Sequence, residues 1–544
     1  MLLDLSSEEP VGFIVDEGKA TSFVFASDRK RYPPKFEYLT VRSEEFVGDK
    51  LEPVDVLAQV ERISSLSLAL RRDLDIEAIH RIKEAGIDDV KTWGSARILG
   101  YLVTSSKGAA PKVLIPRRAV TPGQPIYIAP DHFLKKFYEY PSEEALYIGN
   151  LITRPKVPAH ISINGFRRHL AILAQTGAGK SYLTGVLVEE LMAHGATVLI
   201  VDPHADYVLL SQTTTGGRHE FSERVSVFQN PESTSRYSQK DIGRVESYTV
   251  KLADVPFEEL CNICGIGKGY TNIRDALHRA LERLKKQGIV YLVEDIEESL
   301  KSIAQDEELE RTVRQSAQAS LKYIRKLRRL RVFSRSGVPI ENILKPCQTS
   351  VIDLSGLESY STDYIVSRLL SDAFSAVASG SFDFPVFLVV EEAHNFIPAG
   401  DETRSLSVIR RIAGEGRKFG IFLIVISQRP GKIHSDTLSQ CNSQIVLKIT
   451  NPQDQTAIAN SSERLSEDLV SDLPGLNVGE AVIVGEVTRS PVMIRVRTRR
   501  TKEGGADIDV VSRLRKARKA AGIDEQLAKE RRQQTRMKGR FSEV

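Results

Sequence analysis

Residues 174–181 read AQTGAGKS, and their types and spacing suit the binding of a nucleotide phosphate. The P-loop pattern is a glycine, four variable residues and Gly-Lys, followed by Ser or Thr. Gly179, Lys180 and Ser181 match this pattern, and Ala174 stands where the first glycine is usual. In such a loop the backbone N–H groups surround a phosphate, the lysine reaches the β- and γ-phosphates, and the hydroxyl binds Mg²⁺. We therefore expect ATP and Mg²⁺ as ligands.

The elements around this loop are those that phosphate binding requires. The apolar run AILA precedes the loop, and the helical segment SYLTGVLVEELMAHG follows it. This order directs loop N–H groups and the positive end of a helix dipole at the same phosphate. The expected nucleotide contacts are consecutive residues of the loop and of the first helical turn: Thr176, Gly177, Ala178, Gly179, Lys180, Ser181 and Tyr182.

Two glutamates follow a second apolar run, PVFLVVEEAHNF. Residues Val386–Val390 predict a buried strand that ends at Glu391 and Glu392. Glu391 is placed to hold the shell of the magnesium ion, where the shorter Asp is usual. Glu392 is placed to orient and activate the attacking water. This arrangement predicts hydrolysis of ATP as well as binding.

Two more polar residues flank the next apolar run, GIFLIVISQRP. Gln428 follows it, where a polar side chain can sense the γ-phosphate or cap the strand. Arg417 precedes it in a turn that contains Gly414 and Gly416. An arginine there either projects towards the nucleotide of a neighbouring subunit or is an ordinary surface residue. The sequence leaves both alternatives open for each residue.

Two other motifs carry less information. Cys261 and Cys264 form a CxxC pair, but no second pair follows at zinc spacing, and the surrounding FEELCNICGIG is typical of an apolar helix face. The tetrapeptide EEAH, which includes His394, is similar to the DEAH box of helicases with two RecA folds. Only one P-loop core is evident, so we expect His394 to support a catalytic neighbour or to be structural, and not to be catalytic itself.

Hydrophobic periodicity divides the chain into parts of different fold class. Short strands with frequent turns predict a small N-terminal β-barrel, with a helical excursion over residues 66–91. Longer β-branched runs that alternate with helices predict a RecA-like α/β core with a parallel sheet, interrupted by charged helices. The predicted parts are the barrel at 1–145, the core at 146–255 and 336–488, the helical insertion at 256–335, and a C-terminal β end with a basic tail at 489–544.

Composition narrows the cellular setting. No apolar stretch approaches the roughly 18 residues of a membrane span, and MLLDLSSEEP is not typical of a signal peptide. Four cysteines in 544 residues do not make a disulfide framework, so we expect a cytoplasmic protein. From Arg489 onward there are 17 Lys and Arg against 7 Asp and Glu, whereas the rest of the chain is slightly acidic. This tail is either a contact for nucleic-acid phosphates or a solvated helix.

Five segments in order resemble the archaeal HerA family of the HerA–FtsK superfamily. They are NGFRRHLAILAQTGAGKSY, VLIVDPHADY, FLVVEEAHNF, IAGEGRKFGIFLIVISQRP and LSQCNSQIVLKI. The resemblance covers nearly the whole chain, with a HAS-barrel at its start and a helical insertion. It implies a homohexameric ring that translocates or unwinds double-stranded DNA by ATP hydrolysis. It also implies a NurA-type nuclease as partner, in DNA end resection and recombinational repair.

The resemblance assigns roles to matching residues. Lys180 and Ser181 become the phosphate and magnesium contacts, and Glu392 the catalytic glutamate. The remaining assignments are Arg417 as an arginine that acts in trans, Gln428 as a sensor of the γ-phosphate, and Arg168 as a basic residue near the phosphates. Ala174 and Glu391 depart from the commonest forms. The stretch RPGKIHSDTLSQ, with Arg429 and Lys432, is either a pore loop that contacts DNA or an ordinary connection.

Other classes of function share parts of this pattern. An FtsK-type or conjugation-type DNA pump would bring membrane spans or a different accessory domain. A protein-remodelling ring ATPase would be stimulated by unfolded protein and not by DNA. A scaffold that only binds nucleotide would lack a placed glutamate, whereas Glu392 is present.

Overall fold

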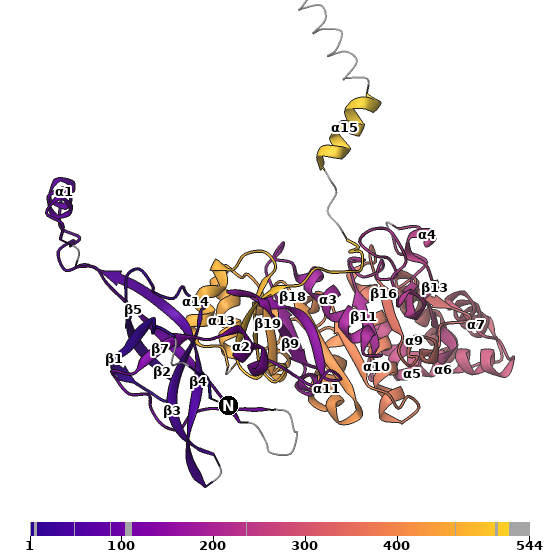
Figure 1. Cartoon of the computed structure of the whole chain (residues 1–544). Coiled ribbons are helices and arrows are strands. Elements are labelled where there is room, and N and C mark those ends of the chain that lie inside the picture. The colour runs from indigo at the N-terminus through magenta and orange to yellow at the C-terminus, as the bar shows by residue number, and fades with distance from the viewer. Residues whose placement is uncertain are drawn as a thin grey trace, which may run out of the picture.

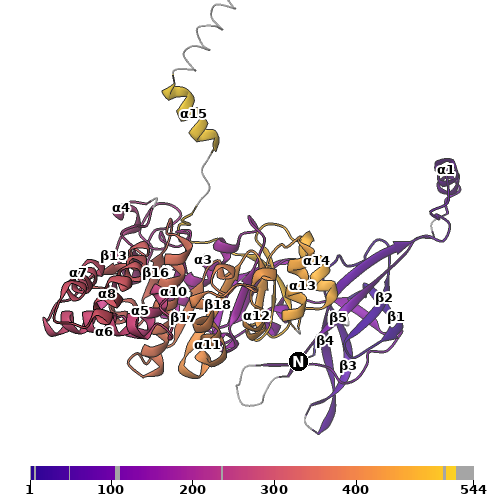
Figure 2. The ribbon, with the colours of Figure 1, turned by 180° about the vertical axis from the view of Figure 1, so that it is seen from behind.

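The computed structural model describes residues 2–4, 8–47, 49–87, 89–103, 111–234, 237–462, 464–505 and 510–521. The described chain forms a β-barrel, an α/β core and a helical region inserted in that core (Figure 1). The barrel and the inserted helices lie at opposite ends of the core, as the view from behind also shows (Figure 2). This arrangement leaves the core sheet between them.

The N-terminal sheet closes on itself. Its order is β2-β1-β7-β3-β4-β5-β6, and a further pairing of β2 with β5 makes a ring of six strands. Side chains alternate along these strands, so that Ile14, Phe23 and Phe25 are buried inside. The strands are β1 (Gly12–Gly18), β2 (Ser22–Ser27), β3 (Tyr38–Val47), β4 (Lys50–Leu66), β5 (Lys91–Val103), β6 (Lys112–Leu114) and β7 (Pro125–Ile128).

The expected helical excursion lies between β4 and β5. It contains helix α1 (Ile76–Glu84), which begins at the capping residue Asp75 and has no buried residue. Figure 1 shows α1 at the tip of a long projection from the barrel.

The core sheet has twelve strands in the order β13-β12-β16-β11-β17-β18-β10-β19-β20-β21-β8-β9. Pairs from β13 to β19 are parallel, and pairs from β19 to β9 are antiparallel. The strands are β8 (Ala145–Leu151), β9 (Arg154–Ser162), β10 (Leu170–Leu173), β11 (Thr197–Asp202), β12 (Val225–Gln229), β13 (Val245–Ser247), β16 (Thr349–Asp353), β17 (Val386–Val390), β18 (Ile421–Ser427), β19 (Ser443–Val446), β20 (Glu480–Val484) and β21 (Val492–Val496).

The predicted RecA-like α/β class is confirmed, because the β-branched runs form strands that are buried on both faces. Helices cover the two faces of the sheet, and their apolar sides supply most of its packing. They are α2 (Asp131–Phe137), α3 (Lys180–Ala193), α4 (Gln239–Ile242), α9 (Ile340–Ile343), α10 (Ser359–Ala378), α11 (Arg404–Phe419), α12 (Ser435–Gln440), α13 (Pro452–Ser461) and α14 (Glu467–Asp472).

The inserted helices form a small bundle. Helix α6 buries Leu277, Leu281 and Leu284 at helical spacing and leaves its charged face exposed. The bundle consists of α5 (Phe257–Cys264), α6 (Thr271–Lys286), α7 (Val293–Gln305) and α8 (Arg311–Ile324). Along the chain these helices come after β14 (Val250–Lys251) and before β15 (Phe333–Ser334), and the two strands pair with each other. Short 3₁₀ segments complete the fold: η1 (Ile163–Arg168), η2 (Ser222–Arg224), η3 (Leu252–Asp254), η4 (Arg325–Arg329), η5 (Ala393–Asn395), η6 (Pro430–Lys432) and η7 (Leu473–Gly475).

The predicted C-terminal β end and basic tail begin within the core sheet. Strand β21 pairs with β20 and β8 within the core sheet. Residues 497–505, here called the strap, then run back along α3, where Arg497 and Arg499 contact that helix. A basic helix, α15 (Val510–Ala520), has no buried residue and projects from the core (Figure 1).

Candidate nucleotide-binding site

The P-loop connects β10 to α3 and has the backbone that phosphate binding needs. Gly177 and Gly179 have φ of 77° and 98°, in the region that favours glycine, and Gly179 precedes the first turn of α3. Ala174 lies at the end of β10, is fully buried and does not have a positive φ. An alanine therefore serves there without strain.

Lys180 is held between two buried carboxylates. Its Nζ lies 2.7 Å from Glu391 Oε1 and 2.8 Å from Glu392 Oε1. Strand β17 delivers both glutamates at the carboxyl end of the sheet, next to the P-loop. Burial alone would lower the pKa of Lys180, but the two carboxylates reverse this effect and raise it. The lysine is therefore cationic, and phosphate would compete with the glutamates for it.

The two glutamates keep oxygens available for a ligand. Glu391 Oε2 and Glu392 Oε2 are buried and accept no hydrogen bond, although His394 Nδ1 lies 3.2 Å from Glu392 Oε2. Burial raises the pKa of Glu391 to about 7 despite the opposing effect of Lys180. Glu392 has φ of 49°, a strained conformation for a residue other than glycine, and such strain concentrates at functional sites.

A cavity of about 780 Å³ opens over this loop. Its walls include eight of the predicted residues and Gln175 beside them. The eight are Thr176, Gly177, Gly179, Lys180, Ser181, Tyr182, Glu392 and Gln428. Ala178 and Glu391 are not part of the wall, and Glu391 is fully buried beneath it. The cavity thus combines loop N–H groups, a lysine and a carboxylate.

Gln428 directly follows β18 and is part of the cavity wall. Its Oε1 accepts a hydrogen bond from the Thr176 hydroxyl of the P-loop. His394 Nδ1 lies 3.2 Å from the Ser427 hydroxyl and next to Glu392. Gln428 is thus in direct contact with the loop that would hold phosphate, and His394 supports the strand end.

Arg168 and Arg417 lie at the amino ends of the core strands, away from the P-loop. Arg168 ends η1 just before β10, so the whole of β10 separates it from the P-loop. Arg417 is in the last turn of α11, just before the amino end of β18, which runs parallel to β10. Both side chains are exposed, and neither is part of the cavity wall. Within one subunit, therefore, the structure does not bring Arg168 or Arg417 to the phosphates.

Several cavity residues were not predicted. His204 and Asp206 come from the segment DPHADY after β11, and Asp206 accepts a 2.7 Å hydrogen bond from the Ser181 hydroxyl. The carboxyl end of a neighbouring parallel strand was a signal that could have found them. The other missed wall residues come from the segment before β20 and from the strap: Val478, Gly479, Glu503, Gly504 and Gly505.

The site fits Mg²⁺ only together with a nucleotide. Ser181, Asp206 and Glu391 offer oxygen atoms, the donor type that Mg²⁺ prefers. Within the described ranges, however, no cluster of three His, Cys, Asp or Glu could hold a metal by itself. Mg²⁺ usually retains waters and shares its ligands with substrate phosphates, so this donor set suits a magnesium nucleotide.

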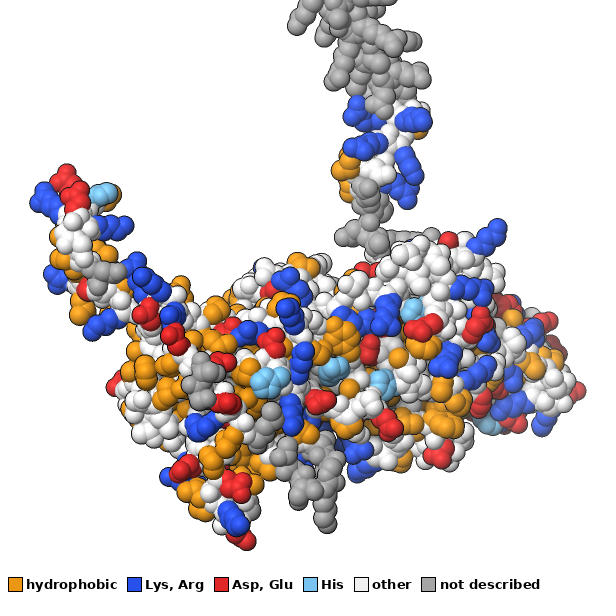
Figure 3. Space-filling model, in the orientation of Figure 1, with side chains coloured by type: hydrophobic (Ala, Val, Ile, Leu, Met, Phe, Trp, Pro, Cys, Tyr) orange, Lys and Arg blue, Asp and Glu red, His pale blue; other side chains and the backbone are white. Residues whose placement is uncertain are grey.

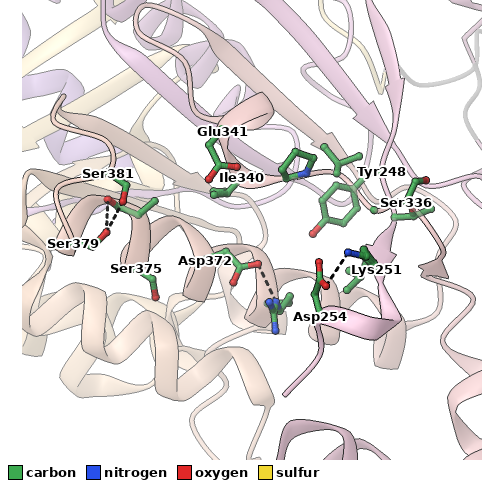
Figure 4. A pocket seen from close by; sticks show the side chains of 17 residues that line it. Tyr248, Lys251, Asp254, Ser336, Ile340, Glu341, Asp372, Ser375, Ser379 and Ser381 are labelled. Carbon is green, nitrogen blue, oxygen red and sulfur yellow. Dashed lines mark hydrogen bonds and ion pairs between the residues drawn. The ribbon is translucent and has the colours of Figure 1, made fainter. Parts of the chain in front are cut away.

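A second cavity, of about 640 Å³, lies beside α10 at the base of the inserted helices (Figure 4). Its cations already have partners, since Arg368 pairs with Asp372 at 2.9 Å and Lys251 with Asp254 at 3.0 Å. It therefore offers less free positive charge for phosphates than the P-loop cavity. Cys261 and Cys264 are buried free thiols in α5, as the apolar helix face predicted.

Comparison with known proteins assigns the chain to a family. Residues 146–373 match the family model "Helicase HerA, central domain". A probable DNA double-strand break repair helicase HerA of Methanocaldococcus jannaschii is 30% identical over 79% of this chain and 90% of its own length. The chain belongs to the HerA family. The DNA double-strand break repair helicase HerA of Pyrococcus furiosus is 28% identical over 94% of this chain and 98% of that protein.

Membership of the HerA family agrees with the resemblance of the five motifs. Among solved structures, the unbound conjugative coupling protein TrwB covers 68% of this chain and 92% of its own, with 13% identity and a TM-score of 0.46. No helix in the described part of the chain is long and apolar enough to cross a membrane.

Proposed function

We propose that this chain is an ATP-driven translocase or helicase of double-stranded DNA that acts in double-strand break repair. The observation that carries the proposal is Lys180, which lines a 780 Å³ cavity and is paired there with Glu392 and with Glu391, which is buried beneath the cavity wall. HerA relatives named as DNA double-strand break repair helicases support the DNA substrate.

In this proposal each side chain has a definite task. Lys180 leaves the glutamates to neutralise the β- and γ-phosphates, and Ser181 contributes its oxygen to Mg²⁺, which would screen the charge of the phosphates. Glu392, freed from Lys180, accepts the proton of the attacking water. Gln428 contacts the γ-phosphate and reports its presence to the P-loop through Thr176. Glu391 supports the magnesium shell from below.

The proposal includes a homohexameric ring. Arg168 and Arg417 are exposed at the amino ends of the core strands, away from their own cavity. In a ring they face the nucleotide of the neighbouring subunit, where a positive charge stabilises the transferred phosphoryl group. Arg429 and Lys432, exposed around η6 at the carboxyl end of the sheet, are proposed contacts for DNA.

The proposed partner is a NurA-type nuclease, as the family resemblance implies, with the barrel as docking site because it carries none of the predicted catalytic residues. Co-expression of the full chain with such a nuclease from the same genome, followed by co-purification, tests this part. A nuclease that never co-purifies with the full chain contradicts it.

The deciding experiment measures ATP hydrolysis with and without duplex DNA, together with the mass in solution. We expect stimulation by duplex DNA and a hexameric mass. Stimulation by unfolded protein alone would instead favour a protein-remodelling ATPase. An FtsK-type or conjugation-type pump shares this core and would also be stimulated by duplex DNA, and co-purification with the nuclease distinguishes the two.

A further inference from the structure

Ser181 has an unexpected hydrogen-bond partner. In P-loop ATPases the P-loop hydroxyl and a strand-end acid hold Mg²⁺ together. Here the strand-end acid is Glu391, whose Oε1 binds Lys180 and whose Oε2 accepts no hydrogen bond. The Ser181 hydroxyl instead donates to Asp206 Oδ2 at 2.7 Å. Asp206 thus occupies the place beside Ser181 that the longer Glu391 leaves open.

Asp206 is held in place by the turn that follows β11. The buried Asp202 carboxylate accepts three backbone N–H groups of this turn, from His204, Asp206 and Tyr207, at 2.9–3.2 Å. Ala205, between them, has φ of 61°, which is strained for alanine. A strained turn that is closed by a buried carboxylate fixes the direction of the next side chain.

The strap holds the other side of Asp206. The Gly504 N–H donates to the Asp206 carbonyl at 2.9 Å. A side chain on Gly505 would collide with the Asp206 carboxylate, and one on Gly504 would collide with Ala205. The fully buried Arg499 meanwhile donates to the Ser181 carbonyl at 3.1 Å. The strap therefore fixes the backbone of Ser181 and the position of Asp206 together.

The direction of this hydrogen bond has a chemical consequence. A hydroxyl has one proton and two lone pairs, and an ionised carboxylate can only accept. When the Ser181 proton points to Asp206, its lone pairs are left for a cation.

We propose that Asp206 is a positioning residue of the magnesium nucleotide site, which turns the Ser181 hydroxyl so that its oxygen faces Mg²⁺. This inference rests on the proposed ATP-binding function. The competing role is a plug that occupies Ser181 until a nucleotide displaces it. The two roles predict opposite effects on affinity when the carboxylate is removed.

The test measures binding of a fluorescent ATP analogue to the full chain in EDTA and in Mg²⁺. The ratio of the two affinities is the magnesium enhancement. Asp206→Ala is expected to reduce this enhancement by about 10-fold or more, as loss of an outer-shell partner of a metal ligand does. Affinity in EDTA is expected to stay within about twofold of that of the unsubstituted chain, since the phosphate contacts of the loop remain.

Two further variants separate positioning from a general effect. Asp206→Asn keeps an acceptor oxygen for Ser181 and should retain part of the enhancement. Asp206→Ala combined with Ser181→Ala should match Ser181→Ala alone, because Asp206 acts through that hydroxyl. Gly505→Ala, which leaves both side chains intact but crowds the carboxylate, should also lower the enhancement. Glu223→Gln, at an exposed residue paired with Arg218, controls for loss of a charge elsewhere.

Three outcomes would overturn the inference. They are an unchanged magnesium enhancement in Asp206→Ala, a further loss when Asp206→Ala is added to Ser181→Ala, and tighter magnesium-nucleotide binding, which would identify the plug. Failure of the unsubstituted chain to bind the analogue at all would instead refute the proposed ATP site. Thermal unfolding of each variant shows whether it is folded, and Asp206→Asn keeps the test decisive if Asp206→Ala does not fold.

Discussion

Arg497 and Glu189 form a buried ion pair that joins the strap to the P-loop helix. Arg497 Nη1 lies 2.8 Å from Glu189 Oε2, and Arg497 Nη2 lies 2.7 Å from Glu190 Oε1. Glu189 also accepts the N–H groups of Arg500 and Thr501. The chain after the last strand is therefore attached to the helix that would hold the nucleotide.

Removal of this arginine should destabilise the core. Arg497→Ala leaves two glutamates without their cation, and breaking a buried pair in this way costs about 3–5 kcal/mol of the free energy of unfolding. Arg495→Ala is the comparison on the adjoining strand β21, because that side chain is 66% exposed and its partner Glu480 keeps two hydrogen bonds from Asn477. Its expected cost is about 1 kcal/mol or less. Urea unfolding of both variants makes the comparison, and equal midpoints would contradict it.

The predicted catalytic pair should separate binding from hydrolysis. Lys180→Ala removes the cation that neutralises the phosphates, so ATP turnover should be lost while the chain stays folded. Glu392→Gln keeps the shape of the side chain but cannot accept a proton, so ATP should still bind while turnover falls by orders of magnitude. Steady-state hydrolysis and nucleotide binding are measured for both. Turnover in Glu392→Gln equal to that of the unsubstituted chain would refute its role as the base.

The buried His169 should make stability depend on pH. Its Nε2 lies 2.9 Å from the Ala413 carbonyl, and its Nδ1 accepts the Leu423 N–H at 3.0 Å. Burial lowers the pKa of His169 from 6.5 to about 4, so the unfolded chain takes up the proton first as pH falls. The contribution is fully present above pH 6.5 and declines by about 3 kcal/mol as pH falls to 4.

His169→Asn tests this dependence, because it keeps a polar side chain but removes the imidazole that titrates, and the backbone there, with φ of 58° and ψ of 163°, is strained for either residue. The free energy of unfolding of the variant should fall less steeply between pH 6.5 and pH 4 than that of the unsubstituted chain. His80→Asn, at an exposed residue of α1, should follow the unsubstituted chain. Parallel curves for His169→Asn and the unsubstituted chain would show that His169 is not the group that titrates.

The sequence predicted the elements of the site well because each is encoded locally. The run Val386–Val390 with its two glutamates, and the loop before α3, need only neighbouring residues to specify them. The strap was taken for part of the tail because its arginines have the composition of a solvated segment. Arg499 is nevertheless 1% exposed, and its backbone N–H donates to the hydroxyl of Tyr182 in α3. Such a contact between distant segments cannot be predicted from the local sequence.

Contacts between distant segments explain the other differences. The pairing of Ser181 with Asp206 depends on the positive φ of Ala205. The sequence does not predict this conformation, because alanine does not favour it. Arg168 precedes the P-loop by a short stretch of sequence, yet strand β10 separates them, because Arg168 lies before the amino end of β10 and the P-loop follows its carboxyl end. The structure thus separates Arg168 from the P-loop of its own subunit, and its place near the phosphates of a neighbouring subunit stays a prediction.

The basic end of the chain should contribute to DNA binding. Helix α15 exposes Arg513, Arg515, Lys516, Arg518 and Lys519, and Figure 3 shows Lys and Arg side chains around it. The residues after 521 lie outside the described part. If duplex DNA binds through phosphates, affinity should be insensitive to sequence and fall steeply with salt. Truncation before Arg513 should weaken binding and flatten its salt dependence while nucleotide affinity is unchanged.

Salt titrations on unrelated duplexes measure these effects. A variant with the five basic residues of α15 changed to Gln retains the length of the tail and controls for its removal. It should reproduce part of the loss. Strong sequence preference, or binding that does not respond to salt, would count against a translocase.

Arg417 tests the ring itself, because it lies at the amino end of β18, whereas its own nucleotide cavity lies at the carboxyl ends of the core strands. An arginine that acts in trans stabilises the transferred phosphoryl group only when a neighbour is present, and its loss costs about 10³–10⁵ in turnover. Arg417→Ala should therefore bind ATP and form rings but hydrolyse almost nothing. Lys180→Ala should also be inactive, because it lacks the cation that neutralises the phosphates in the cavity of its own subunit.

Co-expression of the two inactive variants distinguishes action in trans from action in cis. In a mixed ring, some interfaces combine an intact Lys180 from one subunit with an intact Arg417 from its neighbour. Those interfaces are complete, so part of the ATP hydrolysis should return. If Arg417 acted within its own subunit, every cavity would lack one of the two residues and mixing would restore nothing. Mixed rings confirmed by mass, but without recovered hydrolysis, would refute the trans role and weaken the case for a hexameric motor.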